Sequence, residues 1–243
     1  MLLAPFIGSF LGVIVTRNRA LATALIGRSA CDACGHTLRV PDLVPLLSWA
    51  VQGGTCRYCG ASISWFYPAI EIGAVAVALW SASVFSGTTL WLSCGLGWTL
   101  LALAATDIKY FLLPDILTLP LIVFGLLANA ALEANGLAEQ LLSDRVIGAA
   151  AGYAFVRVLR CIYRLLRRRE GIGLGDAKLF AAAGAWISWQ VLPSVLVIAS
   201  VLALAAVLVW RGPGLEAARR VPFGVFLAMG LWITWLYGPL TAG

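Results

Sequence analysis

Long apolar stretches dominate this sequence and constrain its fold more than any other feature. Of its 243 residues, 61% are hydrophobic and 12% are charged, whereas about a quarter of the residues in an ordinary soluble domain are charged. A membrane-spanning helix needs roughly 20 apolar residues, and about 17 at the least. Eight stretches approach that length: 1–17, 66–86, 88–107, 113–134, 145–165, 175–190, 191–210 and 222–240. The sequence therefore predicts an all-α polytopic membrane protein with about eight transmembrane helices.

The placement of basic residues supports eight spans over seven, the main alternative. That alternative arises at 188–193 (SWQVLP), where the sixth and seventh stretches meet with little polar sequence between them. With eight spans, all but one of the 17 lysines and arginines fall on the segments and span ends of one side, and only Arg145 falls on the other. Basic residues concentrate on the cytoplasmic side of membrane proteins. We therefore expect both termini to lie outside the cytoplasm.

The start of the chain divides into two segments of different character. Residues 1–17 have no basic residue ahead of the apolar stretch and no small-residue cleavage site, so a retained helix is expected rather than a signal peptide. The next segment is too long for a simple turn. We expect three parts: transmembrane helix 1 (1–17), a cytoplasmic segment (18–65) and a transmembrane domain (66–243).

The net charge of +6 does not indicate a nucleic-acid partner. Lysines and arginines beside membrane spans are first of all orientation signals. The partner that the composition predicts is the lipid bilayer, and no nucleic-acid partner is expected.

A Cys-x-x-Cys-Gly motif occurs twice in the cytoplasmic segment, at 31–35 (CDACG) and 56–60 (CRYCG). Two thiolates on one tight turn bind a single metal ion, and glycine permits the bend after the second ligand. Disulfides, the alternative, rarely persist in the cytoplasm. We predict a structural Zn²⁺ site whose ligands are Cys31, Cys34, Cys56 and Cys59. Four thiolates complete a tetrahedron, so His36 is expected to be a polar loop residue. Cys94 and Cys161 are expected to be small buried side chains.

Acidic residues within membrane spans are costly and often functional. Asp107 ends the third stretch and Asp176 begins the sixth, so the eight-span topology places them at one depth on one side. Two apposed carboxylates cannot both ionise cheaply, and the resulting acid beside a base is the arrangement of aspartic proteases. Gly173 and Gly175 would let a substrate backbone approach Asp176. The alternative is that Asp176, like Asp115, only stabilises a helix N-terminus.

Five stretches together resemble the type IV prepilin peptidase family, over nearly the whole chain. They are GSFLGVIVTR (8–17), the cysteine motifs around VPLLSW (44–49), FYPAIE (66–71), TDIKYFLLPDILTLP (106–120) and GLGDAKLFAAAGAW (173–186). The resemblance implies an aspartic endopeptidase of the bacterial inner (cytoplasmic) membrane, with its active site facing the cytoplasm. It would cleave the basic leader of prepilin or pseudopilin precursors of type IV pilus and secretion systems. The resemblance also implies that Asp107 and Asp176 are the catalytic residues, and it gives no catalytic role to Asp115.

Two questions stay open at this point. Many members of the family also N-methylate the new terminus with S-adenosylmethionine, and this chain departs from the family in the part linked to methylation. DLVP (42–45) stands where the family often has Asn-Ile-Pro, and 16–34 lacks a proline-containing stretch. The alternative function is that of a membrane transporter or scaffold whose zinc segment docks a cytoplasmic partner. A transporter is considered because intramembrane acids also serve in proton relays.

Overall fold

A computed structural model describes residues 3–17, 29–134, 142–168, 171, 173–211 and 221–240. A helix lies at the position of each predicted span: α1 (Ala4–Thr16), α4 (Phe66–Val84), α5 (Gly87–Tyr110), α6 (Asp115–Ala134), α7 (Leu142–Arg167), α8 (Leu174–Ile187), α9 (Leu192–Arg211) and α10 (Phe223–Tyr237). Between α1 and α4 the structure adds a short 3-10 helix, η2 (Val40–Leu43), and α3 (Leu47–Val51). The described residues form no β-strand, only two isolated bridges. The all-α prediction is confirmed.

Within the described ranges, five helices are long and apolar enough to cross a membrane: α4, α5, α6, α7 and α9. α1 and α10 are shorter apolar helices, and α8 has 14 residues, buried along most of its length. The chain is therefore an integral membrane protein, and its exact number of spans stays a prediction. The sixth and seventh stretches are separate helices, because Ser188 has a φ of 74° and leaves the helical conformation between α8 and α9.

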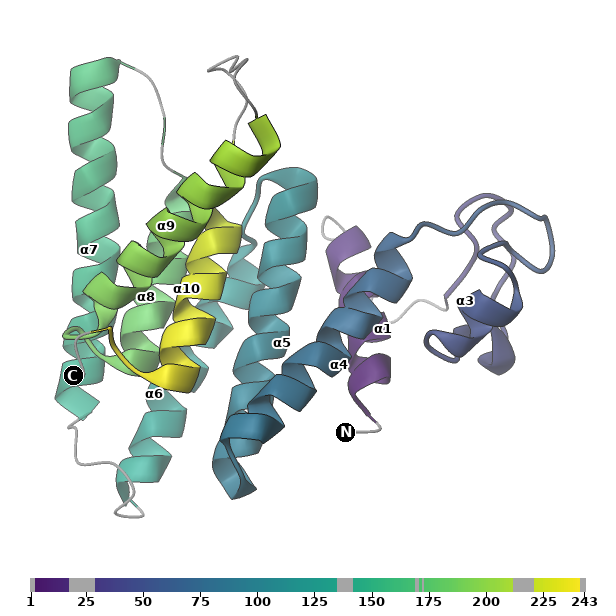
Figure 1. Cartoon of the computed structure of the whole chain (residues 1–243), viewed down its shortest axis with the longest axis horizontal. Coiled ribbons are helices and arrows are strands. Elements are labelled where there is room, and N and C mark those ends of the chain that lie inside the picture. The colour runs from purple at the N-terminus through teal and green to yellow at the C-terminus, as the bar shows by residue number, and fades with distance from the viewer. Residues whose placement is uncertain are drawn as a thin grey trace. The chain divides into compact units, whose positions relative to one another are not determined.

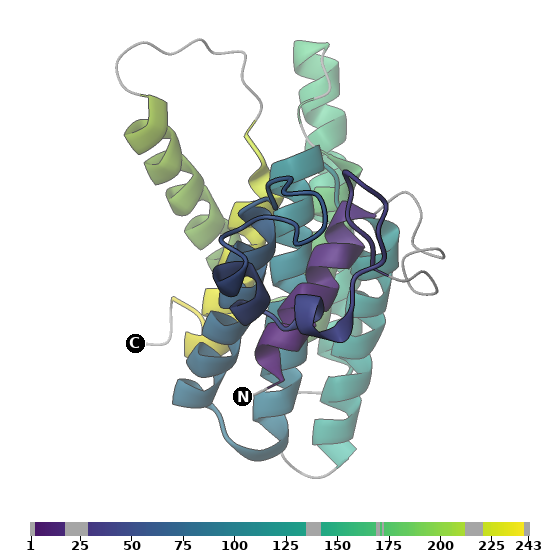
Figure 2. The ribbon, with the colours of Figure 1, turned by 90° about the vertical axis from the view of Figure 1, so that its right-hand side faces the viewer.

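The contacts divide the chain into two compact units, residues 1–102 and 103–243. In the first unit α1 packs along α4, as Figures 1 and 2 both show. The contact requires Gly8, because a Cβ atom there would lie 2.6 Å from the Cα of Glu71. The buried Glu71 carboxylate accepts a hydrogen bond of 2.8 Å from the backbone N–H of Leu46. This contact ties the segment before α3 to α4. The three-part division predicted from the sequence stays a prediction.

α8 forms the centre of the second unit. It packs against α6, α7, α9 and α10 (Figure 1). α7 and α8 touch through their backbones, since a Cβ atom at Gly184 would lie 2.1 Å from the carbonyl of Gly148. The indole N–H of Trp186 donates to the carbonyl of Leu121 at 2.9 Å, which ties α8 to α6. These contacts hold the C-terminal half of α8 against α6 and α7.

The one basic residue outside the predicted charge pattern has a structural partner. Arg145, in the first turn of α7, donates a hydrogen bond to the carbonyl of Trp186 near the end of α8. Asn129 donates to the carbonyls of Ala185 and Trp186, each at 3.3 Å. The last carbonyls of a helix have no partner within it, and a cation there also interacts favourably with the helix dipole. Arg145 therefore stabilises the end of α8.

Candidate functional site

Two carboxylates come together in the second unit, where α5 ends and α8 begins. Asp107 lies in the last turn of α5 and is 6% exposed. Asp176 lies in the first turn of α8, and the two carboxylates interact through their like charges. Leu113 packs against both helix starts nearby: Cβ atoms at Gly175 of α8 and Gly224 of α10 would lie 2.7 Å and 3.0 Å from its side chain. The structure thus brings together the two acids that the topology placed at one depth.

The start of α10 surrounds the Asp107 carboxylate. Backbone N–H groups of Gly224 and Val225 donate to it. A Cβ atom at Gly224 would lie only 2.8 Å from Asp107 Oδ2, so glycine permits the close approach. Among the described residues, Oδ2 has no hydrogen-bond partner although it is buried. A buried acceptor of this kind is available to a water molecule, a proton or a substrate. Gly224 was not predicted as a site residue, because its only signal in the sequence is its position at the start of the last predicted span.

Asp176 both caps the start of α8 and lies near Asp107, the two roles that the sequence left as alternatives. Its Oδ2 accepts a hydrogen bond of 3.2 Å from the backbone N–H of Gly173, as a helix-capping residue does. The same carboxylate faces the charge of Asp107. Asp115, at the start of α6, forms an ion pair with Lys178 of α8. This ion pair links α6 to the first turns of α8.

The two glycines proposed to admit a substrate differ in their surroundings. Gly173 is exposed, whereas a Cβ atom at Gly175 would lie 2.7 Å from Leu113 Cβ. We expect Gly175→Ala to lower the rate of the leader cleavage that the family resemblance implies about 10- to 100-fold. The variant would displace Asp176 or Leu113, and small misplacements of catalytic groups are costly. The double variant Gly175→Ala/Leu113→Ala should recover activity in the same assay. A double variant as slow as the single one would show that open space at Gly175, rather than packing, is required.

The four cysteines of the two motifs converge in the first unit. The Sγ atoms of Cys31, Cys34, Cys56 and Cys59 all lie within 4.8 Å of one another. Cys31 Sγ and Cys59 Sγ are 3.8 Å apart, which matches the edge of about 3.8 Å in a tetrahedron with Zn–S bonds of about 2.3 Å. A disulfide requires about 2.05 Å. The four cysteines therefore form a cluster that could bind a metal, and their geometry fits zinc.

Both motifs fold in the same way. In each, the backbone N–H of the final glycine donates to the carbonyl of the first cysteine at 2.9 Å, from Gly35 to Cys31 and from Gly60 to Cys56. The two glycines have φ angles of 70° and 71°, which side-chain-bearing residues rarely adopt. The glycine of the motif is thus a geometric requirement of the turn that carries the thiols.

The thiols of the cluster have unequal proton affinities. Backbone N–H groups of Cys34 and Ala33 lower the pKa of Cys31 to about 7. The backbone N–H of Ala61 favours the Cys59 thiolate, but burial and the three neighbouring thiols outweigh it and raise the pKa of Cys59 to about 12. Thiolates are the metal-binding form of cysteine, so metal binding would release protons from this cluster.

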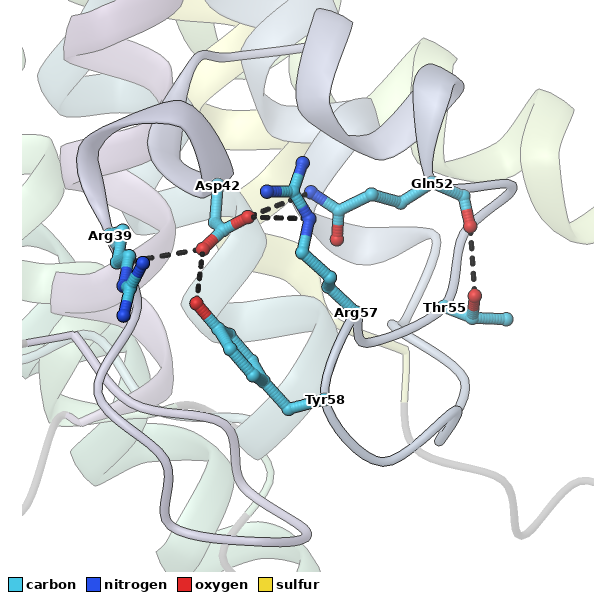
Figure 3. Close-up of polar contacts among 6 residues, drawn as sticks. All are labelled: Arg39, Asp42, Gln52, Thr55, Arg57 and Tyr58. Atoms are coloured by element: carbon cyan, nitrogen blue, oxygen red, sulfur yellow. Dashed lines mark hydrogen bonds and ion pairs between the residues drawn. The ribbon is translucent and has the colours of Figure 1, made fainter.

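A buried carboxylate connects the parts of the cysteine segment (Figure 3). The Asp42 side chain is 2% exposed and forms an ion pair of 3.4 Å with Arg57. It also accepts hydrogen bonds from the backbone N–H of Arg39 at 3.1 Å, Gln52 Nε2 at 3.3 Å and the hydroxyl of Tyr58 at 3.3 Å. Asp42 thereby joins η2, α3 and the second cysteine motif. In the sequence, Asp42 stood out only as part of DLVP (42–45), which departs from the family pattern.

We expect Asp42→Ala to destabilise the cysteine segment by about 2 kcal/mol, since it leaves several donors without their acceptor. The exposed Arg57 can find water instead, which limits the loss. Protease cleavage of the segment in sealed membranes measures the effect. Asp32→Ala is the matched control, because Asp32 is an exposed acid of the same segment. Equal protease resistance in both variants would contradict this role for Asp42.

The remaining sulfur and imidazole groups lie outside the cysteine cluster. The ring of His36 stacks on Tyr58 with centroids 3.8 Å apart, and His36 is not among the metal-binding group. Cys94 is buried, as expected, but the expectation for Cys161 was wrong because its side chain is exposed. It lies in the last turns of α7, where every described residue from 161 to 168 is exposed.

Comparison with known proteins identifies the family. The type IV leader peptidase family matches residues 94–208, and the bacterial peptidase A24 N-terminal domain matches residues 2–85. No solved structure matches this chain.

Three relatives share the name prepilin leader peptidase/N-methyltransferase. The Burkholderia pseudomallei (strain 1026b) protein is 43% identical over 222 residues, which are 88% of this chain and 68% of the relative. The Aeromonas hydrophila protein is 40% identical over 224 residues, covering 88% and 73%. The Pseudomonas aeruginosa protein is 34% identical over 265 residues, covering 98% and 89%. With these identities over most of both sequences, this chain belongs to the type IV leader peptidase family.

Proposed function

We propose that this protein is an aspartic endopeptidase that cleaves the basic leader from prepilin or pseudopilin precursors. One observation carries the proposal: Asp107 and Asp176 lie close enough for their like charges to interact where three helix ends meet, and the buried Oδ2 of Asp107 has no partner among the described residues. The names of the relatives support prepilins as the substrate class. Membership of a peptidase family favours this function over a transporter or scaffold.

The two carboxylates would share one proton. Two backbone N–H groups, of Gly224 and Val225, donate to Asp107, whereas one, of Gly173, donates to Asp176. Because more donors favour the charged form, we assign Asp107 the role of base. Asp107 takes a proton from a water molecule as the water oxygen attacks the scissile carbonyl. Asp176 then gives its proton to the leaving nitrogen as the C–N bond breaks. Transfer of the proton from Asp107 to Asp176 restores the pair.

The direct test uses the purified protein in detergent and a precursor with a basic leader. Mass spectrometry of the products should show one cut at the end of the leader. An intact precursor, with a catalytically active relative as the positive control, would contradict the proposal.

We infer that this reaction takes place at the cytoplasmic face of the bacterial inner membrane. The helix ends that carry Asp107 and Asp176 lie on the side that holds nearly all lysines and arginines in the sequence. Labelling of single cysteines introduced near Asp176 by a membrane-impermeant reagent, in spheroplasts and in inverted vesicles, tests this orientation. Labelling in spheroplasts alone would contradict it.

We further infer that Cys31, Cys34, Cys56 and Cys59 hold one structural Zn²⁺. The distances between their sulfur atoms fit a tetrahedral site. Four thiolates leave no open position on the metal, so zinc would order the segment around Asp42 and take no part in peptide cleavage.

A second activity, N-methylation of the new terminus with S-adenosylmethionine, is favoured by the names of the relatives. The departures at 16–34 and 42–45 lie in the part that the family resemblance links to methylation. Incubation of the purified protein with labelled S-adenosylmethionine and a precursor tests for this methyltransferase activity. Labelled mature product supports the activity, and unlabelled mature product excludes it.

A further inference from the structure

A pocket outside both candidate sites lies between the last turns of α7 and the start of α8. It has a volume of about 160 Å³ and is lined by Arg157, Arg160, Cys161, Arg164 and Leu174. This volume is well above the ~10–15 Å³ that one water molecule requires. Figure 1 shows that α7 continues past the point where α8 begins.

Three guanidinium groups share one face of this part of α7. Residues three, four and seven positions apart lie on the same side of a helix, where like charges destabilise one another. No acidic residue in the described part of the chain pairs with Arg157 or Arg164. The side chain of Arg157 lies over the ring of Tyr153 at 5.9 Å, which holds it beside the pocket. Arg157 and Arg164 therefore carry positive charges that an anionic ligand could offset.

The opposite face of the same turns is apolar. Phe155, Leu159, Ile162 and Leu166 repeat at helical spacing, and all are exposed. A helix with a basic face and an exposed apolar face is typical of the boundary between lipid tails and headgroups. This end of α7 therefore fits a lipid surface.

The length of α7 and the arginines of its last turns are consistent with a pocket at that boundary. Its 26 residues extend about 39 Å at 1.5 Å per residue, whereas the hydrocarbon core of a bilayer is about 30 Å thick. The helix is thus about 9 Å longer than the core, and the arginines in its last turn favour this end for the excess. With the excess at this end, Arg164 reaches the headgroup layer, and Arg160 and Arg157 lie about 1.5 Å and about 6 Å inside the core edge. Long arginine side chains extend from such depths toward phosphates.

We propose that Arg157, Arg160 and Arg164 form a binding site for a phosphate group. The planar guanidinium group binds two phosphate oxygens at once, and several together fix the orientation of the ligand. Anionic phospholipid headgroups and free phosphate offer the same chemistry, and the position at the membrane boundary favours the headgroup. A Cβ atom at Gly171 would lie 2.4 Å from the ring of Tyr163, so the chain entering α8 packs against the same turns of α7. A bound headgroup would therefore steady the helix that carries Asp176.

The test measures thermal unfolding of the purified protein in a neutral detergent. Three additions are compared: phosphatidylglycerol, phosphatidylcholine and inorganic phosphate. At a hundredfold excess over its Kd, phosphatidylglycerol should raise the Tm by about 5 °C or more, and phosphatidylcholine should not. Arg157→Gln/Arg164→Gln should abolish the shift. Arg167→Gln/Arg168→Gln is the matched control, since it removes two charges from the same helix end without touching the pocket, and it should keep the shift.

The outcomes distinguish a lipid headgroup from free phosphate as the ligand, and they also show when the proposal fails. A shift with inorganic phosphate that depends on Arg157 and Arg164 supports the site and identifies free phosphate as its ligand. Equal shifts in both double variants overturn the site. If the first double variant does not fold, native mass spectrometry of Arg157→Gln and Arg164→Gln singly should show about tenfold weaker retention of phosphatidylglycerol than Arg167→Gln. Equal retention in all three also overturns it.

Discussion

Replacing either Asp107 or Asp176 by asparagine is expected to lower the rate of leader cleavage by a factor of about 10²–10⁴. Asparagine keeps the size of the side chain but can neither accept a proton from water nor carry one to the leaving nitrogen. The rate is measured as kcat/KM on a precursor peptide with purified variants in detergent. The pH dependence adds a second readout, because a base and an acid acting together give a bell-shaped profile whose two limbs both require the pair.

The control for this prediction is Asp115→Asn. Asp115 lies near Asp107 in the sequence and pairs with Lys178, but it is not assigned to the dyad. We expect less than a tenfold loss, because an exposed ion pair contributes little. Full activity in Asp107→Asn or Asp176→Asn would remove that residue from the mechanism. A loss in Asp115→Asn as large as in the dyad variants would show that the assay reports folding of this region and not catalysis.

The second large effect is expected from Cys31→Ser/Cys56→Ser, which removes one thiol from each motif. Structural zinc contributes on the order of 10–16 kcal/mol to the folding of small domains, so the segment should lose both its metal and its order. Metal analysis should fall from one zinc per chain to none. Protease sites between 29 and 65 should become accessible while the membrane helices stay protected.

Cys94→Ser and Cys161→Ser are the matched controls, because both cysteines lie outside the cluster. Each should retain one zinc per chain. An unchanged zinc content in Cys31→Ser/Cys56→Ser would contradict the metal site. Loss of zinc without increased protease cleavage would show instead that the network around Asp42 holds the segment together.

The sequence predicted the helices well because apolar length and charge placement are local signals. Both sides of the break at Ser188 became separate helices, although the sequence there has little polar character. The exposed Cys161 was missed because apolar composition cannot show that α7 extends past its neighbours. The partner of Arg145 was also hidden, since a carbonyl at the end of another helix leaves no trace in the sequence.

The acids and cysteines of the candidate sites could be predicted from the sequence, but the residues around them could not. Asp107 and Asp176 stand out as charges at span ends, and the cysteine motif is repeated. Gly224 has no comparable signal, because its role arises from a close approach to Asp107 in the fold. Asp42 was equally hidden, since its donors come from several elements of the segment.

The central claim is that Asp107 and Asp176 act as one unit, and a double-mutant cycle on kcat/KM tests it most directly. Residues that share one proton lose their joint function when either is changed, so their effects do not add. The account predicts that Asp107→Asn/Asp176→Asn cleaves the precursor no more slowly than the slower single variant. A double variant whose loss equals the product of the two single losses would show independent roles and contradict the dyad.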